Sequence, residues 1–392
     1  MSRSPILANG AAILFGLAVA LLPAELILRF LPVNTGLRTV TVNAGQPVFH
    51  FTPNLPFVYS NGWNLAMANE GRVNNAGFVN DQDYRPDGPP LLAVVGDSYV
   101  EALMVPYGQT LHGRLAAQAG DQARVYSFAA SGAPLSQYLA FSRHATRDWG
   151  ATALVIVVVG NDFDESLARI RVGPGFHHYV EGEDGDLALR LFDFTPNPLG
   201  RLAIQSALGR YLIFNLKIGE LWRMAADQFQ VIAPARAAAP SYVGNTLADA
   251  DAVRIGQSER AVDAVFRDLP RWSGLPPERI LFVMDGLRYP SHAGSDHGQS
   301  YFGRMKGYFM AQAKAQGYET IDVDPAFFAH AAAHPTDRFE FPQDAHWSSL
   351  AHGIVADLIR RSAFYGKVTG APWDQSSLRP LSPSPRTNMP PP

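Results

Sequence analysis

The sequence predicts an α/β protein with a central parallel sheet and helices on both faces of that sheet. Two observations predict this class: short, fully apolar runs recur along the chain, and helix-length stretches separate them. Strands of parallel sheets are apolar throughout because helices cover both of their faces. The five runs are Leu91–Val95, Val125–Ala129, Ala153–Val159, Ile280–Met284 and Thr320–Val323. The expected helices are Thr110–Ala119, Leu135–Trp149, Glu259–Leu269, Ser300–Gln316 and about Ser348–Phe364.

Residues 1–33 predict a transmembrane anchor or a signal segment. The run from Ile6 to Leu22 is almost wholly apolar and is near the lower length limit, about 17 residues, of a membrane-spanning helix. Ala18-Val19-Ala20 is compatible with cleavage, so a removed signal peptide is the main alternative, and a buried core helix is a third. We favour an uncleaved anchor because Glu25–Phe30 continues as an amphipathic helix. The rest of the chain is expected to be exported, facing the periplasm or cell exterior, or secreted if the segment is cleaved.

The exported part divides by composition into a lead-in, a main domain and a tail. Residues 34–90 are rich in Asn, Gly and Pro and predict an irregular or short-strand lead-in. The main domain covers 91–370, and within it residues 163–257 are too long for a strand-to-helix connection. We expect this insertion to cap or flank the functional site. Residues 371–392 are rich in Pro and Ser and predict a disordered tail.

Composition narrows the functional classes. The net charge of −3 gives no reason to expect a nucleic-acid partner. The chain has no cysteine, which excludes disulfides, thiolate metal sites and a cysteine nucleophile. With 47% hydrophobic and 17% charged residues, the chain has the composition of a globular protein.

Three short segments would together make one hydrolytic site. They are Gly96-Asp97-Ser98, Gly160-Asn161-Asp162 and Asp344-Ala345-His346, and the first two follow apolar strands. Functional groups of parallel sheets collect beyond the carboxyl ends of the strands. A serine, a histidine with a carboxylate and an amide donor are the parts needed for acyl transfer through a serine ester.

Ser98 is the candidate nucleophile and His346 its candidate base. A hydroxyl needs a base to attack at neutral pH, and Asp344 is placed to orient the imidazole and stabilise its charged form. The alternative for Ser98 is that it or Asp97 only caps the next helix. The alternative for Asp344 and His346 is that they form a surface Asp–His pair at the start of a helix.

The oxyanion of the tetrahedral intermediate requires hydrogen-bond donors. Asn161 offers a side-chain amide, Gly132 an unobstructed backbone N–H, and Ser98 its own backbone N–H. Gly132 is equally well explained as a turn glycine.

Other polar groups are less informative. His177-His178 is expected not to bind metal, because no third ligand accompanies it. The acidic run of Asp162, Asp164 and Glu165 has incomplete spacing for a calcium loop and predicts a solvated turn. For three aspartates at or near strand ends a site role and a capping role stay open: Asp285, Asp322 and Asp324.

With these residues the chain resembles the SGNH/GDSL hydrolase superfamily, over about Leu91 to Phe364. The four namesake residues of that family correspond here to Ser98, Gly132, Asn161 and His346. The resemblance implies a flavodoxin-like three-layer α/β/α fold with a five-stranded sheet, no cofactor, and ester hydrolysis or acyl transfer.

The departures from the family pattern point to a subgroup. Ser127 stands where family members often have asparagine, and Asp-x-His replaces the commoner Asp-x-x-His. Asp344-Ala-His-Trp347 is similar to the motif of exported polysaccharide O-acetylation proteins of the alginate type. Asn74-Asn-Ala-Gly-Phe78 resembles the lead-in of membrane-anchored members.

The leading hypothesis is therefore an esterase that cleaves an O-acyl ester, with O-acetyl favoured, of a cell-envelope or extracellular glycan through an acyl-enzyme. An O-acetyltransferase with the same triad is the first alternative, and a non-catalytic glycan-binding protein is the second. The expected partners are the acylated carbohydrate or another ester, the membrane, and a membrane-bound acyltransferase. A two-metal hydrolase would need a His/Asp cluster that these spacings do not supply.

Overall fold

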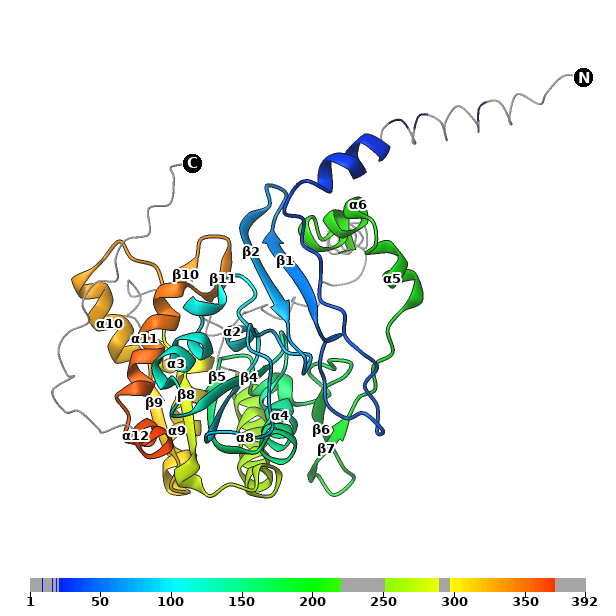
Figure 1. The fold of residues 1–392 in the computed structure, drawn as a ribbon. Coiled ribbons are helices and arrows are strands. Elements are labelled where there is room, and N and C mark those ends of the chain that lie inside the picture. Colours follow the sequence, from blue (N-terminus) through cyan, green and yellow to red (C-terminus); the bar gives the residue numbers. More distant parts are fainter. Residues whose placement is uncertain are drawn as a thin grey trace, which may run out of the picture.

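The chain folds around a five-stranded parallel sheet, seen in a computed structural model (Figure 1). The structure describes residues 21–219, 251–288 and 297–370, together with Asn9, Gly16 and Val19. The sheet order is β4-β3-β5-β8-β9, which is the 2-1-3-4-5 order of flavodoxin-like doubly wound sheets. The predicted fold class is confirmed. The strands are β3 (Leu91–Gly96), β4 (Arg124–Ala129), β5 (Ala151–Val158), β8 (Ile280–Met284) and β9 (Glu319–Asp322).

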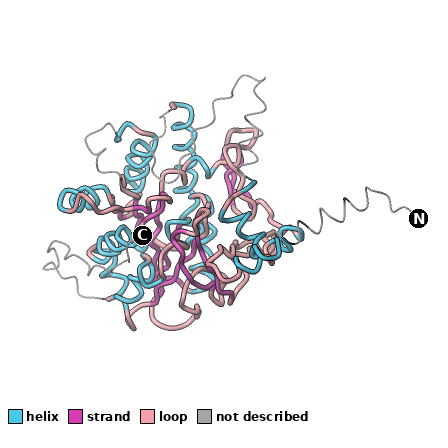
Figure 2. The backbone as a smooth tube through the Cα atoms, turned by 90° about the horizontal axis from the view of Figure 1, so that it is seen from above, coloured by secondary structure: helices cyan, strands magenta, loops and turns pink. Residues whose placement is uncertain are grey.

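The two faces of the sheet bury separate apolar cores, because successive residues of a strand point to opposite faces. In β3, Leu91, Ala93 and Val95 pack with side chains of three helices, α4 (Leu135–Trp149), α8 (Ala252–Ser273) and α9 (Tyr301–Ala315). Leu92 and Val94 pack on the other face with side chains of α3 (Leu111–Ala119), α11 (Ser349–Arg360) and α12 (Ala363–Thr369). Seen from above, helices lie around the central strands (Figure 2). The resulting three layers hold the carboxyl ends of the strands at one edge.

Most helices begin close to where the sequence predicts them. The helix at 135–149 matches the prediction, whereas the helix predicted from Glu259 starts earlier, at Ala252. The last predicted helix is two helices, because Ser362 caps a new one by accepting a hydrogen bond from the backbone N–H of Tyr365. The helices are α2 (Ser98–Glu101), α3 (Leu111–Ala119), α4 (Leu135–Trp149), α5 (Pro198–Ala203), α6 (Ala207–Arg210), α8 (Ala252–Ser273), α9 (Tyr301–Ala315), α10 (Asp324–Ala333), α11 (Ser349–Arg360) and α12 (Ala363–Thr369).

Antiparallel hairpins outside the central sheet add to this core. One lies in the lead-in, one in the insertion, and one carries the Asp344-Ala345-His346 segment that the sequence places just before a helix. They are β1 (Leu55–Asn61) with β2 (Ala66–Val73), β6 (His177–Glu181) with β7 (Leu187–Leu191), and β10 (Glu340–Phe341) with β11 (Asp344–Trp347).

The N-terminal part is helical at residues 21–28 in the described portion of the chain. Among the described residues, no helix has the length and apolar character needed to cross a membrane. Almost all of the apolar run at 6–22 lies outside these residues, as do positions 220–250 of the insertion and the tail at 371–392. The anchor and the disordered tail therefore stay predictions.

Candidate active site

Ser98 is placed at the tip of β3, an interior strand of the sheet, by a tight strand-to-helix turn. It is the first residue of α2 and follows β3 after one intervening residue, Asp97. A Cβ atom at Gly96 would lie 2.4 Å from Val100 Cγ2, so the turn requires glycine. Asp97 caps the helix by accepting a hydrogen bond from the Tyr99 backbone N–H at 2.9 Å. Capping is thus carried out by Asp97, and the Ser98 hydroxyl is available to a base.

The structure brings Ser98, His346 and Asp344 together in one hydrogen-bonded line. His346 Nε2 lies 2.7 Å from Ser98 Oγ, and the other ring nitrogen, Nδ1, bonds to Asp344 Oδ1. The backbone N–H of His346 donates to the same oxygen at 3.0 Å. Residues two apart on a strand share a face, so β11 directs both side chains toward α2. The His346 side chain is 18% exposed, which leaves it open to solvent and to a substrate.

The carboxylate of Asp344 is held ionised by its neighbours. Burial raises its pKa, but hydrogen bonds from His346 and the charge of the imidazole lower it more, and the net pKa is below the ordinary value. A carboxylate that stays charged stabilises the imidazolium that forms when His346 takes a proton.

Tyr59, in the lead-in, is a further member of the site that the sequence did not reveal. Its hydroxyl donates to Asp344 Oδ2 at 2.9 Å, from strand β1. Burial and the adjacent carboxylate raise the pKa of Tyr59 well above its ordinary value, so it remains a donor. Two residues on, Asn61 Nδ2 donates to the Gln343 carbonyl at 3.3 Å. The hairpin β1–β2 therefore supports the catalytic strand from outside the domain core.

Arg288 is a second residue that the sequence motifs did not indicate, and it also supports β11. Its guanidinium bonds to the Ala345 carbonyl and the Tyr99 hydroxyl, and its Nε lies 3.4 Å from Glu340 Oε2. Tyr99 donates its own hydroxyl to the Ala345 carbonyl at 2.8 Å. Burial lowers the pKa of Arg288, but Tyr99 and the carboxylates around it raise it to a net value above the ordinary one. A buried cation thus joins β10, β11 and α2.

Asp285 has a structural partner next to the triad. It is buried at the end of β8, where its Oδ1 accepts a hydrogen bond from Trp347 Nε1 at 2.7 Å. Burial raises the pKa of Asp285 to about 6. Asp322 and Asp324 instead pair with Lys306, with the first contact at 2.8 Å. Of the three aspartates, only Asp285 adjoins the strand of His346.

The three candidate oxyanion donors follow three neighbouring strands. Ser98, Gly132 and Asn161 come after β3, β4 and β5, which are adjacent in the sheet, so all three lie at its carboxyl edge. Gly132 has φ +78°, a conformation that favours glycine and suits a turn as well as a donor. A Cβ atom there would lie 3.1 Å from Arg171 Nη2, so the glycine is not as unobstructed as expected.

Asn161 is oriented by an acidic residue. Its Nδ2 donates to Glu165 Oε2 at 3.2 Å, and Arg171 Nη1 forms an ion pair with the same oxygen. The chain Arg171–Glu165–Asn161 therefore borders the edge where an oxyanion would form.

The acidic run around Asn161 is not the solvated turn that its spacing suggested. Asp162 is fully buried, and the Tyr138 hydroxyl donates its one proton to the carboxylate, with both oxygens at 3.0 Å. Asp164 is buried and pairs with Arg254 at 2.7 Å. Spacing alone does not show that partners from other helices cover this turn, and the prediction was wrong for that reason.

No metal cluster accompanies the histidines in the described ranges 21–219, 251–288 and 297–370. His177 and His178 lie in β6, where the first contacts Gln137 Oε1 at 2.9 Å and the second contacts the Glu165 carbonyl at 2.9 Å. Both are held by hydrogen bonds of the fold.

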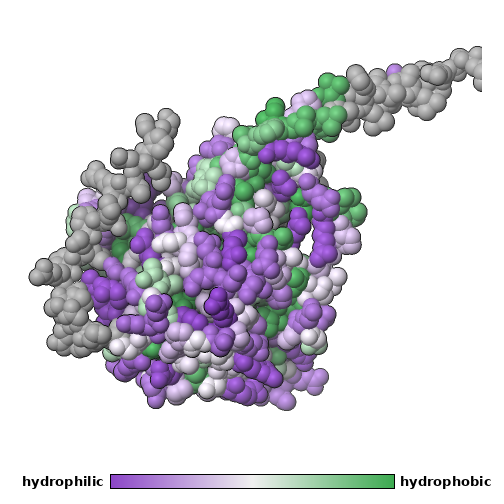
Figure 3. All heavy atoms as spheres, viewed as in Figure 1, coloured by the Kyte–Doolittle hydropathy of each residue, from purple (hydrophilic) through white to green (hydrophobic). Residues whose placement is uncertain are grey.

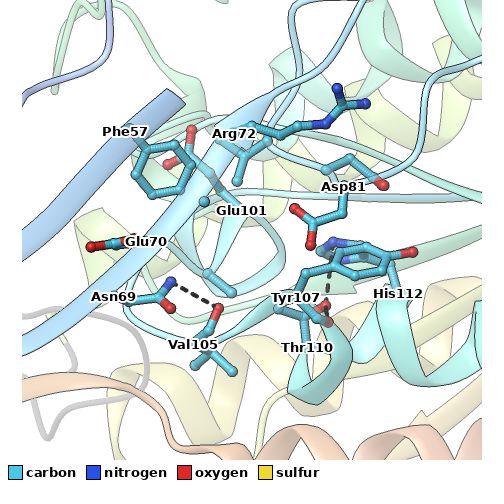
Figure 4. Close-up of a pocket in the computed structure, with 14 residues that line it drawn as sticks. Phe57, Asn69, Glu70, Arg72, Asp81, Glu101, Val105, Tyr107, Thr110 and His112 are labelled. Carbon is cyan, nitrogen blue, oxygen red and sulfur yellow. Dashed lines mark hydrogen bonds between the residues drawn. The ribbon is translucent and has the colours of Figure 1, made fainter. Parts of the chain in front are cut away.

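Glu101 links the nucleophile helix to the loop of Gly132. It lies three residues after Ser98, and its Oε2 accepts hydrogen bonds from the Ser131 backbone N–H at 3.1 Å and from the Ser131 hydroxyl. Burial raises the pKa of Glu101 to about 7. Figure 4 shows Glu101 with Phe57 and Arg72 at the wall of a cavity of about 20 Å³, enough for about one water molecule.

Comparison with known proteins finds solved structures of similar fold. No protein-family model matches the chain, and no curated protein does. An acetylxylan esterase from Geobacillus stearothermophilus has 12% identity and a TM-score of 0.37, covering 74% of this chain and 98% of that one. A lipase from a goat rumen metagenome has 12% identity and a TM-score of 0.36, covering 70% and 98%. A proposed SGNH hydrolase from Slackia heliotrinireducens has 12% identity and a TM-score of 0.30, covering 69% and 97%.

These neighbours are esterases and SGNH-type hydrolases, the class that the sequence motifs resemble. The similarity is distant, and the chemistry proposed for this chain rests on its own sheet order and site geometry.

Proposed function

We propose that the chain is a serine-dependent esterase that works through an acyl-enzyme. The observation that carries the proposal is the line of contacts from Ser98 Oγ to His346 Nε2 at 2.7 Å and from His346 Nδ1 to Asp344. A nucleophile bonded to a base, with the base oriented by a carboxylate, is the geometry that serine catalysis requires.

The reaction follows from these positions. His346 takes the proton of Ser98 as its oxygen attacks the acyl carbon, and the tetrahedral oxyanion accepts hydrogen bonds from Ser98 N–H, Gly132 N–H and the Asn161 amide. His346 then gives the proton to the oxygen of the departing alcohol. The acyl group remains bound to Ser98 as an ester. Water, deprotonated by His346, attacks the acyl carbon. The ester bond to Ser98 then breaks, the acid leaves, and His346 returns the proton to Ser98 Oγ. Asp344 stabilises the imidazolium in both steps.

We propose an O-acyl glycan ester, most simply an acetate ester, as the substrate. The predicted export of the chain supports a cell-envelope or extracellular glycan. Transfer to a sugar hydroxyl instead of water would use the same acyl-enzyme. The balance between hydrolysis and transfer is set by how well the site admits water or an acceptor.

The test is turnover of p-nitrophenyl acetate and longer esters by the full chain, each with an acetylated and a plain oligosaccharide present. Ser98→Ala is the test variant, and Ser349→Ala, a serine on the helix after β11, is the control. We expect release of p-nitrophenol by the wild type and the control and its loss in Ser98→Ala. Acetate in solution indicates an esterase and acetyl on the plain sugar indicates a transferase. Full activity of Ser98→Ala would refute the proposal.

A further inference from the structure

An apolar surface lies at the end of the molecule where the described chain begins. Its side chains come from three segments far apart in the sequence and are strongly exposed: Phe30 is 88% exposed, Trp63 75% and Leu199 75%. Single exposed apolar residues are common, but a group of this kind marks a contact surface. We define the apolar end surface by six residues, namely Leu26, Ile27, Phe30, Trp63, Leu199 and Leu202.

The N-terminal helix and the β1–β2 turn are both hydrogen-bonded to residues 206–211, the segment that follows α5 in the chain, so the surface is a built feature. Glu25, in the N-terminal helix, accepts hydrogen bonds from the Ser206 hydroxyl at 2.7 Å and the Leu208 backbone N–H at 2.8 Å. The Tyr211 hydroxyl donates to the Trp63 carbonyl at 2.7 Å. Figure 1 shows the N-terminal helix, α6 and the tip of the β1–β2 hairpin at the same end of the molecule. In Figure 3 the N-terminal helix and the neighbouring surface are coloured as hydrophobic.

We propose that this apolar end surface rests on a lipid bilayer. The surface continues directly from the apolar run at 6–22, so any bilayer that holds that run lies next to it. Trp63 is of the residue type enriched at the membrane–water interface, and Phe30 is of a type found on the apolar face of helices that lie in that interface. Arg201, in the last turn of α5, supplies positive charge for anionic headgroups, whereas Arg29 is paired with Glu25 at 2.9 Å.

A bilayer contact here has a consequence for the site, which rests on the esterase function proposed above. The β1–β2 turn that carries Trp63 also carries Asn61, which bonds to the Gln343 carbonyl beside Asp344. The insertion helix α5 and the lead-in hairpin thus orient the domain on the membrane with its catalytic hairpin near the surface. Such a placement favours esters carried on chains that are attached to, or emerging at, the membrane.

The absence of cysteine from the sequence makes the test direct, because each introduced cysteine is unique. The full chain carrying Trp63→Cys or Leu199→Cys is labelled with an environment-sensitive fluorophore and bound to phosphatidylcholine–phosphatidylglycerol vesicles. Asp121→Cys is the control, since Asp121 is exposed in the turn between α3 and β4, at the opposite edge of the sheet. Vesicles with a nitroxide group at a shallow depth report contact with the bilayer.

At positions 63 and 199 we expect the fluorophore emission to shift to the blue on vesicle binding and to be quenched by the nitroxide. At position 121 we expect neither change. Equal quenching at all three positions, or none at 63 and 199 in vesicle-bound protein, would overturn the proposal. Energy transfer between labels of two copies without vesicles would also overturn it, in favour of a dimer. A Leu199→Asp, Leu202→Asp variant should lose the quenching at 63. Activity on p-nitrophenyl acetate is measured on each variant, so failure of the bilayer contact is distinguished from failure of the esterase.

Discussion

Ser98 and His346 meet at 2.7 Å, but the two sides of this contact are held by different kinds of structure. Ser98 follows a strand buried in the middle of the sheet, and its turn is fixed by close packing at Gly96. His346 lies on a four-residue strand outside that sheet, held by polar contacts to Tyr59 and Arg288 from distant parts of the chain.

The difference shows that one half of the site, around Ser98, is held by apolar packing, and the other half, around His346, is held by polar contacts. We call these the packed half and the polar half. Packing of apolar side chains keeps the nucleophile in place without any particular polar partner. The base depends on charged and hydrogen-bonded partners, each of which must be satisfied because the groups are buried. We therefore expect substitutions among these polar partners to affect the base more than the nucleophile.

The largest effect should come from removing the base itself. His346→Ala should lower kcat on the order of 10⁴-fold, because His346 Nε2 lies 2.7 Å from Ser98 Oγ, whereas the Asp97 carboxylate lies at 3.4 Å. His330→Ala is the matched control, since His330 forms a 2.9 Å pair with Asp337 away from the site. Steady-state kinetics and circular dichroism are the measurements. Comparable activity of the two variants would show that the Ser98–His346 contact is not catalytic.

Next is the loss of the buried cation that supports β11. Arg288→Met should lower the free energy of unfolding by about 3–5 kcal/mol, because the buried carboxylates of Glu340 and Asp285 lose their counter-charge. Arg267→Met is the control, because Arg267 is 52% exposed, and it should change stability by about 1 kcal/mol or less. Urea unfolding measures both. A stable Arg288→Met protein would show that the polar half of the site is no more sensitive than the packed half.

The third test concerns Glu101, which links the nucleophile helix α2 to the Ser131 loop. Its pKa is raised from 4.5 to about 7, so the folded state holds a proton that the unfolded state releases between these values. The wild type therefore loses stability as pH rises through this window, by on the order of 3 kcal/mol. Glu101→Gln lacks this loss, so its stability relative to wild type should rise from about pH 4.5 to 7 and then level off.

Unfolding at a series of pH values, with Glu70→Gln on the exposed side of β2 as control, measures this change. A difference between Glu101→Gln and wild type that is constant with pH would contradict the expected titration.

The smallest effect should come from Tyr59, whose hydroxyl orients Asp344. Tyr59→Phe should lower kcat about tenfold with little change in KM, because one hydrogen bond to a charged acceptor is lost. Tyr308→Phe removes a similar 2.8 Å hydrogen bond to Asp263 on the surface and should leave kcat unchanged. Equal kcat values for the two variants would remove Tyr59 from the site.

The sequence predicted the packed half of the site better than the polar half, for physical reasons. Fully apolar runs and the residues that follow them depend on local pattern, so the five strands and the positions of Ser98, Gly132 and Asn161 could be placed. Tyr59 and Asp344 are 285 residues apart, and nothing in their local sequence indicates that they meet. Arg288 and the buried acidic run around Asp162 were missed likewise, because burial by remote helices leaves no mark on residue spacing.

Asp344 and His346 are separated by one residue on β11, and this even spacing keeps both side chains on the same face of the strand. A residue inserted between them would send the two side chains to opposite faces of the strand, and one inserted just before them would turn both away from Ser98. Length changes in this hairpin would therefore be tolerated only in steps of two. In a chain with two residues between the catalytic aspartate and histidine, the two side chains can share a face only if this segment is a turn or a helix. The spacing of the two residues therefore indicates the local backbone conformation.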